Sequence, residues 1–101
     1  MDQGDHLKRS LFIKDKQWKI KVQDQVFDEN NHECFGLCDY YRRTITIAKN
    51  QTDRELVDSL LHEILHALFH EYDIEMSAKK DEKVVRELTK LILHCFTLKV
   101  S

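Results

Sequence analysis

The first half of the chain shows the alternation of apolar and polar residues that is typical of β-strands. Trp18, Ile20 and Val22 alternate with Lys and Gln, which predicts a strand with one buried face and one face in water. Residues 34–39 and 43–48 predict two more strands, and the second of these contains four consecutive β-branched residues. We therefore expect a small, about three-stranded sheet, either antiparallel or mixed.

Shorter segments separate these strands. Residues 39–42 are expected to turn the chain into a hairpin, and the polar stretch 27–33, which holds two consecutive asparagines, is expected to be a loop. The first dozen residues have no clear pattern, although three apolar side chains there are spaced as one side of a short helix: Leu7, Leu11 and Phe12.

The second half of the chain predicts two helices. Thr52 and Glu55 have the spacing of a capping box, which marks the first turn of a helix that runs to about His70 or Tyr72. A polar connection over residues 73–80 follows. Beyond it, apolar residues recur at helical spacing and form one stripe of a second helix: Val84, Val85, Leu88, Leu91, Ile92, Cys95 and Phe96.

Order and composition define the class of protein. A sheet followed by two helices is an α+β fold, and a chain without proline or a low-complexity linker predicts a single domain over residues 1–101. Sixteen Lys and Arg against eighteen Asp and Glu leave a net charge of −2, which argues against nucleic acid as a partner. The chain has neither an apolar run long enough to span a membrane nor a signal-peptide pattern, so we expect a soluble, cytoplasmic protein with no membrane partner.

Inside the first predicted helix, His62, Glu63 and His66 form an HExxH sequence. With 3.6 residues per turn, the two histidines stack on one face about 6 Å apart along the axis, where they can hold one Zn²⁺. Glu63 would flank the metal and take a proton from a metal-bound water. His70 lies about 12 Å from His62 along the axis and cannot bind the same ion.

A helical wheel divides this helix into two faces. Apolar residues cluster on the face that we expect to form the core: Val57, Leu60, Leu61, Ile64 and Leu68. The motif falls on the opposite face: Glu55, Ser59, His62, Glu63 and His66. A face in water would usually carry Lys, Glu and Gln, so two stacked histidines with a glutamate between them favour a metal site.

A catalytic zinc site needs a third protein ligand and an open position. The longer metzincin motif is absent, because Phe69 and Tyr72 occupy the positions of its glycine and third histidine. The second helix is the nearest supplier. Glu82 is favoured because it flanks the apolar stripe and can face the first helix. Asp81 lies nearer the centre of the stripe, where an unpaired carboxylate is costly, and it stays an alternative, as does Glu87 on the other flank.

Several segments resemble those of a known family. Residues 60–69 are similar to the active-site helix of small gluzincin metallopeptidases, especially minigluzincins and the short zincin-like proteins of phages and prophages. Residues 36–39, followed by 44–47, resemble the hairpin before that helix, and residues 81–85 resemble the start of the glutamate helix. The resemblance covers about residues 34–96, and HExxH is its one specific motif.

The resemblance implies a minimal zincin-like fold and a hydrolase, namely a zinc metalloendopeptidase acting on a peptide or protein. In such an enzyme His62, His66 and Glu82 would bind Zn²⁺, and Glu63 would be the general base. An edge strand near residues 34–38 would pair with an extended substrate. No residue matches the helper that stabilises the oxyanion, and the candidates are Tyr40, Tyr41, His70, Tyr72 and Arg86.

Other functions compete with proteolysis. The leading alternative is a zincin-like metal-binding module that acts through a protein partner, with regulation or self-inhibition and little proteolysis, because a chain this short leaves little room for specificity pockets. The family resemblance also makes self-inhibition by a terminal segment conceivable, and an exposed apolar end at residues 96–100 could serve a homodimer. A helical interaction domain without a metal is disfavoured, because the first helix carries two histidines and a glutamate on the face opposite its apolar residues.

Overall fold

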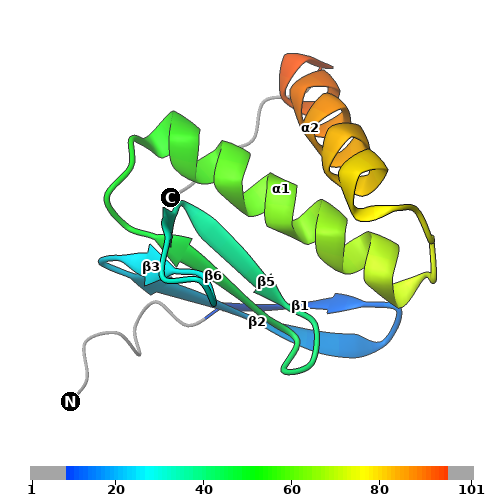
Figure 1. Cartoon of the computed structure of the whole chain (residues 1–101), viewed down its shortest axis with the longest axis horizontal. Coiled ribbons are helices and arrows are strands. Elements are labelled where there is room, and N and C mark those ends of the chain that lie inside the picture. Colours follow the sequence, from blue (N-terminus) through cyan, green and yellow to red (C-terminus); the bar gives the residue numbers. More distant parts are fainter. Residues whose placement is uncertain (1–8, 96–101) are drawn as a thin grey trace.

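The computed structural model describes residues 9–95, which form a mixed sheet and two helices (Figure 1). The main sheet contains β1 (Arg9–Ile13), β2 (Lys16–Gln23), β5 (Gly36–Asp39) and β6 (Thr44–Ala48), in the spatial order β1-β2-β6-β5. β2 and β6 are parallel, and the other neighbours are antiparallel. The α+β fold expected from the sequence is confirmed, with four strands in the main sheet rather than three.

β1 is a strand where a helical spacing was considered. Leu11 and Ile13 face the core, whereas Phe12 between them is 68% exposed, which is the alternation of a strand. Leu7 lies outside the described residues. The turn to β2 has positive φ at both of its residues, as tight hairpin turns require. The helical interpretation was wrong because pairing with β2 decides the structure of so short a segment.

A second, two-stranded sheet pairs β3 (Val26–Phe27) with β4 (Glu33–Cys34). The segment 27–33 is therefore a loop only in its middle, because its two ends pair with each other. The strand expected over residues 34–39 is divided at Phe35, which separates β4 from β5. The hairpin turn between β5 and β6 is confirmed.

The two helices are α1 (Asp53–Glu71) and α2 (Ala78–Cys95). The predicted capping box is present: Thr52 Oγ accepts a hydrogen bond from the Glu55 backbone N–H, and the Glu55 carboxylate accepts one from the Thr52 backbone N–H. α1 lies across one face of the sheet, and α2 packs against α1 (Figure 1). The end expected to serve a dimer, residues 96–100, lies outside the described residues.

The core lies between α1 and the sheet. It is built from Ile13, Trp18, Ile45, Ile47 and Ala67, against which four half-buried residues of α1 pack: Leu56, Leu60, Ile64 and Leu68. The expected division of α1 into a core face and an open face was incomplete. The most buried residues of α1 include Glu63 and Leu65, because the helix has the sheet on one side and α2 on another.

Glu71 ties the end of α1 to the sheet. Its carboxylate is 8% exposed and accepts hydrogen bonds from the indole N–H of the fully buried Trp18, at 2.8 Å, and from the Arg43 guanidinium. The hydrogen bond from Arg43 is the main reason why the pKa of Glu71 is lowered from its ordinary value. This network fixes how the last turn of α1 sits on β2 and the hairpin turn before β6.

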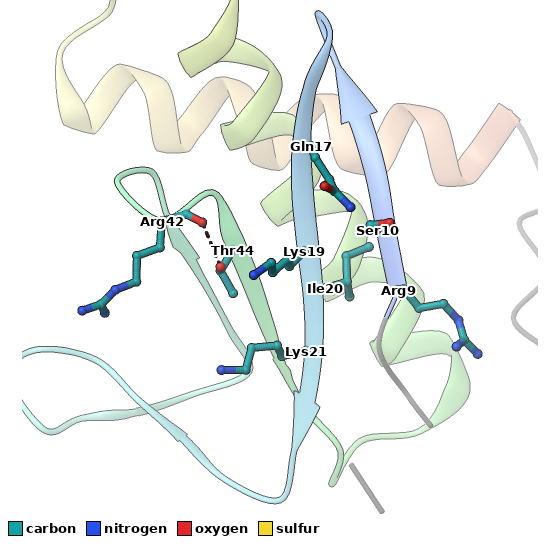
Figure 2. A pocket seen from close by; sticks show the side chains of 8 residues that line it. All are labelled: Arg9, Ser10, Gln17, Lys19, Ile20, Lys21, Arg42 and Thr44. Atoms are coloured by element: carbon teal, nitrogen blue, oxygen red, sulfur yellow. Dashed lines mark hydrogen bonds between the residues drawn. The ribbon is translucent and has the colours of Figure 1, made fainter. Parts of the chain in front are cut away.

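The outer face of the sheet is turned away from α1 (Figure 2). Lys19 and Lys21 project from β2 on this face, towards Thr44 of β6. A shallow hollow of about 680 Å³ lies here, lined among others by Ser10, Gln17 and Arg42. Neither helix in the described part of the chain is long and apolar enough to cross a membrane.

Candidate metal centre

Three side chains from the two helices converge on one point. His62 and His66 extend from the middle of α1, and Glu82 extends from the beginning of α2. One ligand atom of each lies within 4.8 Å of the other two. Glu82 Oε1 is 2.8 Å from His66 Nε2 and 3.3 Å from His62 Nε2. The centroids of the two imidazole rings are 5.0 Å apart.

Local structure accounts for this convergence. His62 and His66 are four residues apart in an uninterrupted helix, so their rings lie on the same face. The chain leaves α1 at Tyr72 and starts α2 at Ala78, a connection short enough to keep the first turns of α2 beside α1. Of the third ligands considered from the sequence, Glu82 is the one that this packing brings into the cluster.

The donor set suits a zinc ion. Two imidazole nitrogens and a carboxylate oxygen form a set used by catalytic zinc sites, in which each donor lies about 2.0–2.2 Å from the metal. Donors at those distances in tetrahedral geometry are about 3.3 Å from one another, which matches the separation of Glu82 Oε1 from His62 Nε2. Glu82 Oε1 is closer to His66 Nε2, at 2.8 Å, so these two atoms would have to move apart slightly to bind the same ion.

Electrostatics favour the metal-binding forms of two of these groups. Burial lowers the pKa of His62, which favours the neutral imidazole that coordinates metals. Burial alone would raise the pKa of Glu82, but the hydrogen bond to His66 and the neighbouring imidazoles outweigh it, so the pKa is lowered and the carboxylate form is favoured.

Glu63 lies between α1 and the edge strand β5. It is 9% exposed, and a Cβ on Gly36 of β5 would lie 3.2 Å from its Oε2 atom. Burial raises the pKa of Glu63 to about 7; His66 opposes this shift and Glu82 adds to it. A carboxyl group tuned to neutral pH and placed beside the cluster has the properties of a general base.

The two alternative ligands take different places. Asp81 lies on the far side of the His66 ring from Glu82, with Oδ1 3.6 Å from Nδ1. Glu87 is exposed and lines a neighbouring, lysine-rich hollow of α2 that also includes Glu82, and it is not part of the cluster.

A cleft of about 440 Å³ opens over the cluster. It runs between the β4–β5 segment, the first half of α1 and the start of α2, and is lined by Cys34, Phe35, Gly36, Gln51, Glu55, Asp58, Ser59, His62, Glu63, Glu82 and Arg86. Two residues of this lining, Gln51 and Asp58, were not singled out from the sequence, whereas Phe35 lies within the segment 34–38 that was expected near the cleft. Gln51 belongs to the loop before α1 and Asp58 to the first half of α1, and neither position is part of a motif.

Of the candidates for oxyanion stabilisation, one lines the cleft and the others lie elsewhere. Arg86 lines the cleft and lies 3.7 Å from Glu82. Tyr40 instead stacks on His70, with ring centroids 4.6 Å apart, and burial raises the pKa of its hydroxyl. The two remaining candidates, Tyr41 and Tyr72, are 93% and 51% exposed and do not belong to the lining.

No family model matches the chain, and neither a curated protein nor a solved structure gives a significant match. The function is therefore argued from the site alone.

Proposed function

We propose that this chain is a zinc metallopeptidase of the zincin type that hydrolyses peptide bonds. The observation that carries the proposal is the convergence of His62, His66 and Glu82, with the buried carboxyl group of Glu63 in the lining of the same cleft. The HExxH sequence provides three of these four residues.

Each group has a defined task. The two imidazoles and the Glu82 carboxylate would hold the ion. When bound, Zn²⁺ supplies a Lewis acid that polarises the scissile carbonyl. Glu63 accepts a proton from the attacking water and returns it to the leaving amine. Arg86, at the rim of the cleft, is the candidate with a fixed positive charge near the developing oxyanion.

The sheet offers a place for an extended substrate. β5 is the last strand of the main sheet and contacts α1, and its first residue, Gly36, lines the cleft. A peptide that pairs with this edge would run past Glu63 and the metal ligands. The cleft also carries Glu55 and Asp58, whose carboxylates favour a peptide with basic residues.

The test compares cleavage by the zinc-loaded wild type and by Glu63→Gln, using a pool of internally quenched peptides. We expect the wild type to cleave part of the pool and the variant to be at least about 100-fold slower with unchanged zinc content. Undiminished cleavage by Glu63→Gln would contradict the assignment of the base. Bound zinc without any cleavage by the wild type would favour the alternative, a metal-binding module that acts through a protein partner.

A further inference from the structure

His66 is held between two carboxylates of α2. Its Nε2 atom is 2.8 Å from Glu82 Oε1, and its Nδ1 atom is 3.6 Å from Asp81 Oδ1. The Nδ1 and Oδ1 atoms are both inaccessible to water, and neither has a hydrogen-bond partner. Buried polar atoms without partners are rare in proteins, and two of them facing each other call for an explanation.

The chemistry of a histidine that binds a metal explains why these two atoms face each other. An imidazole that gives its Nε2 lone pair to a metal carries its proton on Nδ1, and an acceptor beside that proton fixes both the tautomer and the orientation of the ring. Asp81 Oδ1 faces this nitrogen. The present separation exceeds a hydrogen bond by about 0.5 Å, a gap that a small rotation of either side chain closes.

Asp81 and Glu82 are consecutive in the sequence, and this explains why their carboxylates have different roles. Consecutive residues of a helix point about 100° apart, so Asp81 and Glu82 reach opposite edges of the same ring. Asp81 is not part of the group of converging ligand atoms.

We propose that Asp81 is a positioning residue that accepts a hydrogen bond from His66 Nδ1 and holds the ring for metal binding, without being a ligand itself. This inference rests on the proposed metal site and adds to it a residue that determines its affinity. It also explains why a carboxylate stands near the apolar stripe of α2, where it would otherwise be costly.

The first measurement is zinc affinity, determined by competition with a fluorescent chelator. Asp81→Ala is expected to bind zinc about 10–100-fold more weakly than the wild type, and Asp81→Asn, whose amide oxygen can still accept the hydrogen bond, is expected to lose less. Glu82→Gln should lose more than either. Glu87→Ala, which removes an exposed carboxylate from the same helix, is the matched control and should bind like the wild type.

The second measurement is the exchange of the His66 Nδ1 proton with water, followed by NMR in the zinc-loaded protein. We expect a slowly exchanging proton in the wild type and in Asp81→Asn, and rapid exchange in Asp81→Ala. Circular dichroism establishes that each variant is folded, and Asp81→Leu, which also lacks an acceptor but leaves no cavity, carries the test if Asp81→Ala does not fold.

Three results separate the possibilities. Wild-type affinity and slow proton exchange in Asp81→Ala would overturn the positioning role while leaving the metal site intact. Loss of zinc from Asp81→Ala as complete as from Glu82→Gln would also overturn it, because Asp81 would then be a ligand. A wild-type protein that binds no zinc at all would instead remove the proposed function, and the positioning role with it.

Discussion

Gly36 and Glu63 face each other across the contact between β5 and α1. A Cβ at position 36 would lie 3.2 Å from both the Cγ and Oε2 atoms of Glu63 and 3.1 Å from the Cδ1 atom of Ile47. These separations are tight, and the glutamate is the more mobile of the two neighbours. The absence of a side chain on Gly36 therefore leaves the space in which the carboxyl group of Glu63 lies.

We predict that Gly36→Ala displaces Glu63 and lowers kcat about tenfold, because a general base works only within hydrogen-bond reach of the attacking water. The zinc content should not change, since the atoms nearest to a Cβ at this position belong to Glu63 and Ile47 and not to the converging ligands. Steady-state kinetics and elemental analysis of the same preparation provide the measurement. An unaltered kcat would show that Glu63 is not held in place by this contact.

At this scale, the sequence predicted the residues that belong to a motif and missed those that depend on packing. The spacing of His62 and His66 follows from the helical repeat alone. The choice between Asp81 and Glu82 depends on how α2 is rotated against α1, which periodicity defines only to within a residue or so. The closeness of Gly36 to Glu63 depends on a tertiary contact for which the sequence has no local signal.

Among the elements, α1 depends on an anchor at each end. The capping box at Thr52 satisfies backbone groups of the first turn, and Glu71 binds the last turn to Trp18 and Arg43. The two histidines of the proposed metal site lie between these two anchors, so the orientation of α1 determines the orientation of their rings.

Replacing Glu71 with alanine is predicted to lower the free energy of unfolding by about 1–3 kcal/mol, because the buried indole N–H of Trp18 loses its acceptor. Urea unfolding followed by tryptophan fluorescence measures this loss, since the chain has one tryptophan and it is part of the contact. A change within the error of the measurement would mean that a water or another group replaces the carboxylate.

The same carboxylate predicts a pH dependence of stability. The pKa of Glu71 is lower in the folded state than its ordinary value of 4.5. Its stabilising contribution is therefore complete above that value and is lost as the pH falls through the lower, folded-state pKa. The difference in unfolding free energy between wild type and Glu71→Gln should be largest near neutral pH and should shrink in acid. A difference that stays constant down to about pH 3 would contradict this assignment.

Helices and strands were predicted well where the hydrophobic pattern extends over many residues. They were predicted poorly where a short segment becomes a strand only by pairing with a neighbouring strand. Both helices and the capping box followed from spacing over many residues. The pair β3–β4 contains too few residues for a periodic pattern, and the three apolar residues of β1 are consecutive and do not alternate with polar ones. These strands exist because a neighbouring strand completes their hydrogen bonds. The sequence also assigned α1 an open face, because a wheel shows one helix and does not show that α2 covers a second side.

In the whole molecule, two acidic side chains of the cleft and two basic side chains of the outer sheet face lie on different sides, while further basic residues of α2, including Arg86, border the cleft. The cleft beside α1 carries Glu55 and Asp58, whereas the outer face of the sheet carries Lys19 and Lys21 (Figure 2). A basic side chain of a peptide should therefore be attracted to the part of the cleft formed by Glu55 and Asp58.

We predict that Asp58→Lys lowers kcat/KM about fivefold for a peptide with Arg or Lys relative to a neutral peptide, as expected for one reversed charge at an exposed position. Lys21→Glu, on the outer face of the sheet, is the matched control and should leave this ratio unchanged. Raising the salt concentration should reduce the effect of Asp58→Lys. An equal loss for both peptides would argue against selection by charge.

Elemental analysis of protein purified without added metal shows whether His62, His66 and Glu82 bind one zinc ion. We expect about one zinc per chain in the wild type and in Glu63→Gln, and loss of the zinc in His62→Ala and Glu82→Ala. A wild-type protein that contains no zinc, even after reconstitution with the metal, would exclude a zinc site at these residues.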